Sequence, residues 1–248
     1  MIDPFRLDGL RALVTGANTG IGQAIAQSLA ERGAHVLVAG RSDTSNTCAR
    51  IVDAGGSAEG IRLDLSLPQV AAARLAEFGT LDILINNAGI IRREDSVDYS
   101  VTDWDDVMNV NLKAVFLMCQ SFARLAMAQG AGGRIVNIAS LLSFQGGVRV
   151  PAYTASKHGV LGLTRILANE WAACGINVNA IAPGYIATNN TAALREDAKR
   201  SAEILGRIPM GRWGSPSDIG GCVAFLCSPA AAYVTGAVLN VDGGWLAR

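Results

Sequence analysis

Tyr153 and Lys157, in the stretch PAYTASKHGV, are the residues whose types and spacing point most directly to chemistry. A separation of four residues puts both side chains on one face of a helix, where they can act on one substrate. A phenol with a pKa of about 10 is a weak base at neutral pH, and a neighbouring ammonium favours the phenolate. The pair predicts proton transfer to a carbonyl oxygen or from an alcohol. Taken alone, the same spacing is also typical of exposed helices.

Ser140 and Asn111 are candidates for the same site. Ser140 ends the β-prone run GRIVNIAS, and the ends of parallel strands are where open α/β sheets bind ligands. Its hydroxyl is suited to hold the oxygen that Tyr153 protonates. Asn111 falls within a helical pattern, where an amide has poor propensity and can redirect a backbone carbonyl toward water. A purely structural role for Asn111 remains an alternative.

Seven short apolar runs separated by helical patterns must position these residues. Their near-continuous apolar character is what parallel strands covered by helices on both faces show. The chain is therefore predicted to form a single α/β domain over residues 1–248, a Rossmann-type doubly wound parallel sheet. Residues 185–212 form a connection longer than usual and are predicted to act as a substrate lid. The runs cover residues 11–16, 34–40, 58–65, 81–89, 133–140, 176–184 and 236–244.

A glycine cluster follows the first run in TGANTGIG, with Gly16, Gly20 and Gly22 at the predicted turn from strand to helix. Glycines let the backbone approach a pyrophosphate, and the helix N-terminus supplies free N–H groups and partial positive charge. The spacing is TGxxxGxG rather than GxGxxG, and a structural turn is the alternative. The cluster predicts a dinucleotide cofactor.

The end of the second run, VAGRSDTS, bears on which dinucleotide binds. An acidic residue there would bond the ribose 2′-hydroxyl, whereas this chain has Gly40 and the guanidinium of Arg41, which suits a 2′-phosphate. We therefore expect NADP to be preferred, with NAD possible if Arg41 is only a solvated loop cation. Asp64, after the third run, is placed either to bond the adenine amino group or to cap the next helix.

Composition narrows the classes of partner. Lysine plus arginine equals aspartate plus glutamate at 21 each, which disfavours nucleic acid and anionic membranes and suits a small ligand. The five cysteines are scattered and indicate a reducing compartment, so the cytoplasm is expected. The uncharged run 219–241 contains turn residues and is interpreted as helix, turn and buried strand. His35 and His158 lack partners at ligand spacing, so no metal is expected.

The motifs TGANTGIG, NNAG, Asn111, Ser140, Tyr153-x-x-x-Lys157 and IAPGYIAT occur together and in this order. With them the chain resembles the classical short-chain dehydrogenases/reductases over essentially its whole length. The resemblance implies that Tyr153 is the catalytic acid/base, that Lys157 binds the nicotinamide ribose, that Ser140 holds the substrate oxygen and that Asn111 anchors a proton-relay water. It also implies further cofactor contacts by Asn18, Thr19, Ile21, Leu65, Asn87, Ala88, Gly89, Pro183, Gly184, Ile186 and Thr188.

Further stretches, among them IIRREDS, RSAEILGRIPMGRWG and VDGGWLAR, are similar to members of this family that oxidise deoxy sugar acids. The resemblance implies 2-deoxy-D-gluconate or 2-dehydro-3-deoxy-D-gluconate as the substrate. Members with this activity look NAD-preferring, which leaves the cofactor open between NAD and NADP. A sugar acid needs a cation and amide or hydroxyl donors. The candidates are Ser140 and Tyr153 with Arg92, Gln145, Arg149 and Asn189.

Arg149 is the first choice for the cation, because it lies four residues from Tyr153, and surface ion pairing with a nearby Glu or Asp is the alternative. Arg93, Asn190 and Arg212 come from segments near the same strand ends. Two other functions stay open: reduction of another carbonyl, such as a 3-oxoacyl thioester, and non-catalytic regulation by a dinucleotide-binding protein. The resemblance also implies a homotetramer, with the apolar C-terminal strand at an interface.

Overall fold

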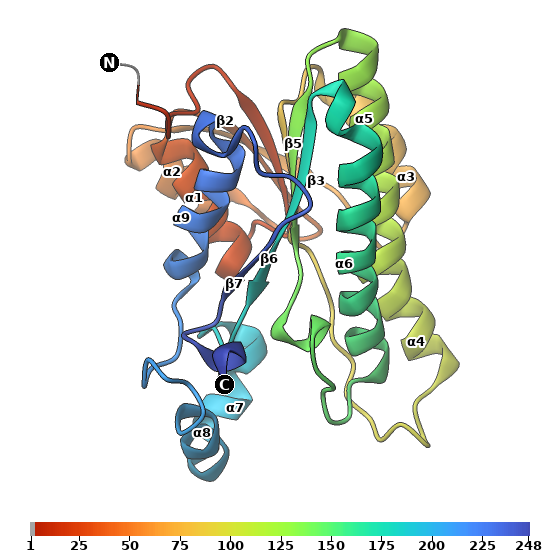
Figure 1. The fold of residues 1–248 in the computed structure, drawn as a ribbon, viewed down its shortest axis with the longest axis vertical. Coiled ribbons are helices and arrows are strands. Elements are labelled where there is room, and N and C mark those ends of the chain that lie inside the picture. Colours follow the sequence, from red (N-terminus) through yellow and green to blue (C-terminus); the bar gives the residue numbers. More distant parts are fainter. Residues whose placement is uncertain (1–2) are drawn as a thin grey trace.

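The computed structural model describes residues 3–248, which form one seven-stranded parallel sheet in the order β3-β2-β1-β4-β5-β6-β7 (Figure 1). The order reverses between β1 and β4, the position at which such sheets bind ligands. The predicted doubly wound α/β class is confirmed. The strands are β1 Arg11–Thr15, β2 His35–Gly40, β3 Ser57–Arg62, β4 Ile83–Asn86, β5 Gly133–Ile138, β6 Ile176–Pro183 and β7 Val238–Val241.

Helices cover both faces of the sheet (Figure 1). On one face lie α1 (Gly20–Glu31), α2 (Ser45–Asp53) and α9 (Pro216–Cys227). On the other lie α3 (Pro68–Ala73), α4 (Val101–Met108), α5 (Ala114–Gln129) and α6 (Pro151–Trp171). Short single turns occur at η1 Arg74–Phe78, η3 Leu141–Ser143, η4 Ala172–Cys174, η5 Asn189–Thr191, η6 Pro229–Ala231 and η7 Trp245–Ala247, and η2 Asn109–Lys113 is a π-helix.

Two apolar layers, one on each side of the sheet, explain the apolar strand sequences. Along β2, Val36 and Val38 pack with Ile25 of α1, while Leu37 packs on the opposite face with Met118 of α5. Successive strand residues point to opposite faces, so a strand covered on both sides needs apolar residues throughout. These layers hold the carboxyl ends of the strands in fixed positions.

The strand at one edge differs from the sequence prediction. Residues 219–241 do form a helix, a turn and a strand, but β7 is half-exposed rather than buried, and Leu239 is 37% exposed. The reason is its position: β7 pairs only with β6, so its other side has no neighbouring strand. Among residues 3–248, no helix is long and apolar enough to cross a membrane.

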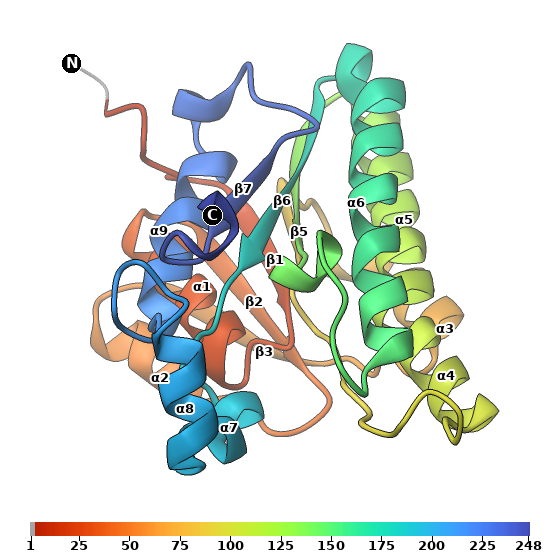
Figure 2. The same ribbon diagram turned by 60° about the horizontal axis from the view of Figure 1, so that its bottom comes forward.

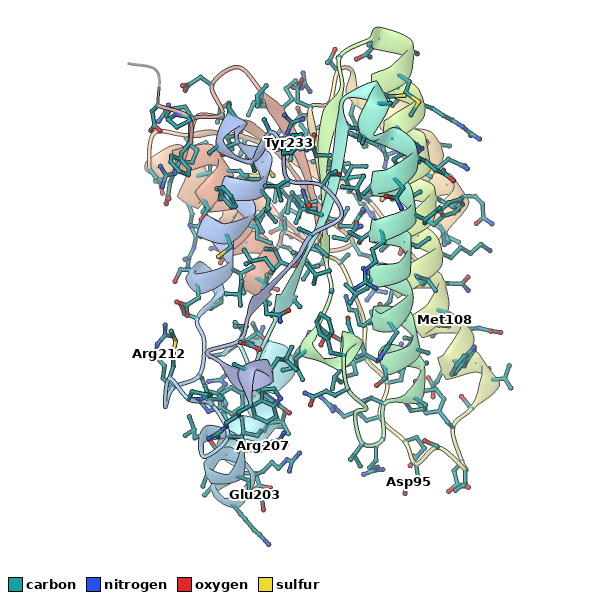
Figure 3. All side chains as sticks on the ribbon, in the orientation of Figure 1. Asp95, Met108, Glu203, Arg207, Arg212 and Tyr233 are labelled. Carbon is teal, nitrogen blue, oxygen red and sulfur yellow. The ribbon has the colours of Figure 1, made fainter. Side chains whose placement is uncertain are left out.

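The segment predicted as a lid leaves the sheet after β6. It contains η5, α7 (Ala192–Glu196) and α8 (Ala198–Leu205), which project beyond the carboxyl ends of β6 and β7 (Figure 2). The chain end at η7 packs beside it, because Trp245 shares an apolar cluster with Ile204 and Ile208. Figure 3 shows Glu203 and Arg207 on this side, and Asp95 across the same edge in the loop after β4.

Candidate active site

The predicted catalytic side chains come together at the carboxyl end of β5. Ser140 directly follows that strand, and Tyr153 and Lys157 lie in the first turns of α6. The Ser140 hydroxyl lies near enough to the Tyr153 phenol to lower its pKa, and the Lys157 ammonium is 5.7 Å from the centre of the tyrosine ring. Ser140 Oγ accepts the Leu142 N–H at 3.1 Å, which leaves the serine hydroxyl proton available to an oxygen in the site.

The electrostatics of Tyr153 differ from the sequence expectation. Burial raises the pKa of the phenol above its ordinary value, and the Ser140 hydrogen bond and the charge of Arg93 partly offset that rise. Burial lowers the pKa of Lys157 to about 8, and its ammonium donates to the Ile138 carbonyl at 2.6 Å. An effect of Lys157 on the pKa of the phenol stays a prediction. Both groups therefore sit closer to neutrality than free side chains.

Asn111 lies in the π-helix η2, an irregular turn between α4 and α5. Its side chain is buried and bridges to Ile90, accepting the backbone N–H at 2.8 Å and donating to the carbonyl at 2.9 Å. A Cβ added to Gly89 would lie 3.3 Å from Asn111 Oδ1 and 3.9 Å from Lys157 Nζ. Asn111, Gly89 and Lys157 thus border one space, and π-turns within helices are frequent at functional sites.

The glycine loop has the form of a phosphate cradle. Gly16 and Gly20 have φ of 63° and 58°, the left-handed region that glycine adopts at no steric cost. A Cβ on Gly22 would stand 2.2 Å from the Gly16 carbonyl oxygen, so only glycine fits there. Thr19 caps α1 without a side-chain hydrogen bond, which leaves the N–H groups of the first turn to a ligand. The residues present fit a dinucleotide.

Asn87 and Thr15 fasten this loop to the end of β4. The Asn87 side-chain amide donates to the Thr15 carbonyl at 2.9 Å and to the Gly16 carbonyl at 3.1 Å. The Thr15 hydroxyl accepts the N–H groups of Asn87 and Ala88 and donates to the Ile85 carbonyl. The predicted contact residues Asn87, Ala88 and Gly16 are therefore brought together across the switch point of the sheet.

The end of β2 presents a polar, cationic surface. Gly40 is buried, Arg41 is exposed, and the Asn18 amide donates to the Ser42 hydroxyl at 3.0 Å. The one carboxylate in this turn, on Asp43, accepts the Ser45 N–H at 3.0 Å and the Ser45 hydroxyl at 2.6 Å, which lowers its pKa. Asp43 is thus engaged with the start of α2, and no acidic residue occupies the position that would bond a ribose 2′-hydroxyl.

Asp64 accepts the Ser66 backbone N–H at 2.9 Å, and this bond, with a smaller contribution from Arg41, lowers its pKa. It therefore closes a turn before α3 rather than capping the helix, whose N-cap is Leu67. Leu65 beside it is buried. Contact of either residue with an adenine stays a prediction.

The residues predicted to line the nicotinamide begin at Pro183, the last residue of β6, and continue into the turn after it. A Cβ on Gly184 would lie 2.6 Å from the Asp242 backbone, so glycine is required where this turn meets the C-terminal segment. Ile186 is buried, and Thr188 approaches the glycine loop, its methyl 3.6 Å from the Cβ position of Gly20. Both loops therefore border the same side of the sheet edge.

The arginines chosen as substrate ligands are engaged elsewhere. Arg149 is exposed and pairs with Glu94 at 3.0 Å and Asp95 at 3.1 Å, the alternative that the sequence left open. Arg92 pairs with Asp103 and Asp106 at 3.3 and 3.5 Å.

Arg93 is the cation whose charge reaches Tyr153, and it makes no ion pair within the part of the chain that the structure describes. Gln145 is half-buried, and Asn189 is exposed at the start of the lid segment. Substrate contact by these residues stays a prediction.

A buried amide chain that the sequence analysis missed sets α6 against the sheet. The Asn86 amide donates to Asn137 at 2.9 Å, and the Asn137 amide donates to the Thr164 hydroxyl at 3.0 Å. All three side chains are buried, so these bonds are costly to lose. Polar residues inside otherwise apolar strands were the available signal.

Comparison with known proteins agrees with this geometry. The family model described as enoyl-(acyl carrier protein) reductase matches residues 16–246. The chain belongs to the classical short-chain dehydrogenase/reductase family.

Within this family the similarity extends over full length. The 2-dehydro-3-deoxy-D-gluconate 5-dehydrogenases of Escherichia coli and Bacillus subtilis are 54% and 52% identical, covering 100% and 99% of this chain and 100% and 98% of theirs. A solved structure from Agrobacterium tumefaciens, provisionally assigned as a 2-deoxy-D-gluconate 3-dehydrogenase with bound NADP, is 61% identical with a TM-score of 0.98 over the whole of both chains. The sequence-based family assignment is confirmed.

Proposed function

We propose that this chain is an NADP-dependent dehydrogenase of a deoxy sugar acid, with 2-deoxy-D-gluconate or 2-dehydro-3-deoxy-D-gluconate as substrate. The observation that carries the proposal is the meeting of Ser140, Tyr153 and Lys157 beside the glycine cradle. The names of the full-length relatives support the substrate class.

The residues divide the proton chemistry among them. Bound NADPH would supply the hydride that reaches the substrate carbon. Ser140 donates a hydrogen bond from its hydroxyl to the substrate oxygen and holds that oxygen beside the phenol. Tyr153 gives its proton to that oxygen during reduction, and in the reverse direction its phenolate takes the proton of the alcohol. Lys157 and Asn111 border the space beside Gly89, where Lys157 can bind the ribose and the pair can hold a relay water.

NADP is proposed over NAD on three features of the β2 end. Arg41 is exposed there, Asn18 and Ser42 offer polar groups, and the carboxylate of Asp43 is held by Ser45. An arginine guanidinium binds phosphate through paired hydrogen bonds, so a 2′-phosphate would find a matched site. Bound NADP in the 61% identical structure supports this choice.

Arg93 is proposed as the residue that binds the substrate carboxylate. Its charge acts on Tyr153, whereas Arg92 and Arg149 pair with neighbouring acids. A sugar acid bound between Arg93 and Ser140 would place its carboxylate on the cation and a secondary alcohol near the phenol. The neighbouring Gln145 and Asn189 are candidates for bonds to its hydroxyls.

Residues 185–212 are proposed as the lid over this site. The segment leaves β6 beside the nicotinamide-lining turn and projects past the sheet edge (Figure 2). Closure would exclude water from a hydride transfer. A fluorescent probe attached to α8 should change its emission when substrate is added. Emission that does not change with substrate would contradict this role.

The protein is also proposed to form a homotetramer in the cytoplasm. An open, half-exposed β7 with Leu239 and a fully exposed Tyr233 is surface that a second copy could cover. All five cysteines are free thiols, and Cys174 is exposed, which suits a reducing compartment. A molar mass of one chain by light scattering would contradict the assembly.

A panel of carbonyl compounds separates this function from its rivals. With NADPH, the purified protein is expected to reduce the ketone that oxidation of 2-deoxy-D-gluconate produces far faster than it reduces a 3-oxoacyl thioester. Preference for the thioester would identify an acyl reductase instead. Cofactor binding without turnover of any compound would favour a non-catalytic regulator.

A further inference from the structure

Ser143 ends the short helical turn η3, between the strand that carries Ser140 and the helix that carries Lys157. It lies outside the catalytic motif, and its side chain is buried at 4% exposure. Buried hydroxyls need partners, and those of Ser143 are the backbones of two catalytic residues.

The hydroxyl of Ser143 bridges these two residues. Its oxygen accepts the Ser140 backbone N–H at 3.3 Å, and its proton goes to the Lys157 backbone carbonyl at 2.8 Å. The Ser143 N–H in turn donates to the Ser140 carbonyl at 2.9 Å. One side chain thus connects the end of β5 to the interior of α6, using one donor and one acceptor in a fixed direction.

The bridge affects the proposed proton transfer because the end of β5, with Ser140, and α6, with Tyr153, meet where the substrate oxygen would bind. Ser140 must stay within hydrogen-bond reach of the Tyr153 phenol, and Tyr153 precedes Lys157 by one helical turn. A displacement of about 1 Å in such an arrangement can cost a large factor in rate. The Lys157 carbonyl lies inside α6, so the helix ladder also uses it, and loss of the bridge leaves the helix intact.

We propose that Ser143 is a positioning residue that holds the serine of the proton-transfer pair in register with the helix carrying the tyrosine. This inference rests on the proposed function of that site. Ser143 does not touch the substrate. It acts through Ser140 and Lys157, so its removal alters the chemical step more than cofactor binding.

The test compares Ser143→Ala with Ser143→Thr and Ser228→Ala. Threonine keeps the hydroxyl and is the rescue variant. Ser228 is a buried serine whose hydroxyl also donates to a carbonyl, that of Phe225 at 2.8 Å, at the far end of α9, so its alanine variant is the matched control. Each protein is assayed for kcat and KM with NADP⁺ and 2-deoxy-D-gluconate across pH, for NADP⁺ affinity, and for thermal stability.

Ser143→Ala is expected to lose about tenfold in kcat with unchanged NADP⁺ affinity and a melting temperature close to that of Ser228→Ala. The low-pH limb of its pH profile for oxidation, where Tyr153 must lose its proton, moves to higher pH, because the Ser140 contact that favours phenolate is weakened. Ser143→Thr recovers most of the rate. A Ser143→Ala protein with wild-type kcat and pH profile overturns the inference, and so does parallel loss of stability, cofactor affinity and rate.

A second readout does not depend on turnover. The phenolate absorbance of each protein, minus that of its Tyr153→Phe counterpart, gives the titration of this one phenol. It is expected at higher pH in Ser143→Ala than in wild type or Ser228→Ala. If wild type shows no turnover but the Tyr153 titration of Ser143→Ala is shifted, the proposed function is refuted and the positioning role still holds. If the Tyr153 titration of Ser143→Ala matches that of wild type, the positioning role is refuted.

Discussion

At the scale of single residues, the site is defined by which charges are free and which are neutralised. Tyr153 and Lys157 are both pushed toward their neutral forms by burial, and Arg93 supplies the charge that opposes this at the phenol. Arg92 and Arg149 carry the same charge but form ion pairs with acidic neighbours. In the proposed function, Lys157 serves the proton transfer and Arg93 binds the substrate carboxylate, so the two roles fall to different cations.

Arg93→Ala is predicted to raise the KM for the sugar acid about ten- to a hundredfold, because a charge-assisted hydrogen bond to its carboxylate is lost. Arg92→Ala is the matched control, since that adjacent guanidinium is held by Asp103 and Asp106. Steady-state kinetics at saturating NADP⁺ measures both. Equal KM values in the two variants would remove Arg93 from the carboxylate site.

Lys157→Met is predicted to change how stability depends on pH. The lysine pKa is about 8 when folded and 10.5 when unfolded, so between these values the unfolded chain binds more protons and wild-type stability rises with pH. The difference between the two pKa values lowers the free energy of unfolding of wild type by about 3 kcal/mol below pH 8, and the methionine variant lacks this loss. Denaturant unfolding at several pH values measures it, with the exposed Lys199→Met as control. Parallel curves for wild type and Lys157→Met would contradict the shift.

Arg41→Ala is predicted to weaken NADP⁺ about ten- to a hundredfold and to leave NAD⁺ unchanged, because only NADP⁺ carries a 2′-phosphate. Arg41 is a better target than Gly40, where an added Cβ would press on Thr44 at 3.0 Å. Arg50→Ala is the control, since that side chain bonds Asn46 on α2. Titration of both cofactors decides the case, and equal losses for NADP⁺ and NAD⁺ would argue against a phosphate contact.

At the scale of elements, the C-terminal segment is attached to the proposed lid. Trp245 is 5% exposed between Ile204 and Ile208, and the Arg207 guanidinium lies 4.0 Å from the centre of its ring. Arg248 donates to the Gly206 carbonyl at 2.8 Å. The same cluster includes Leu141, the residue after Ser140, so the proposed lid and the candidate site share one apolar cluster.

Trp245→Ala is predicted to raise the sugar-acid KM about tenfold while NADP⁺ affinity stays unchanged, since the cavity loosens α8 and not the glycine loop. Loss of so large a buried ring should also lower stability by about 3–5 kcal/mol. Trp245→Phe keeps an aromatic ring there and should recover most of both. A folded Trp245→Ala protein with wild-type KM would show that the C-terminal segment does not support the lid.

At the scale of the whole molecule, the sheet and the meeting of the candidate site residues at its edge could be predicted because their signals are local. Apolar strand runs, the glycine loop and the Tyr153–Lys157 spacing each lie within a few neighbouring residues. The rest depends on contacts between distant segments. Pairing of Arg149 with Glu94 joins residues 55 positions apart, and the half-exposure of β7 follows from its place at the sheet edge. The sequence left ion pairing of Arg149 open, but neither the acid that pairs with it nor the exposure of β7 could be found by reading along the chain.

Oxidation of 2-deoxy-D-gluconate by purified wild type and Tyr153→Phe, followed by nicotinamide absorbance with NADP⁺ and NAD⁺ in parallel, tests the central claim most directly. We expect wild-type turnover that is faster with NADP⁺ and a Tyr153→Phe variant that binds NADP⁺ normally but is at least about a hundredfold slower. Turnover by Tyr153→Phe at the wild-type rate, or none by wild type with this substrate and 2-dehydro-3-deoxy-D-gluconate, would contradict it.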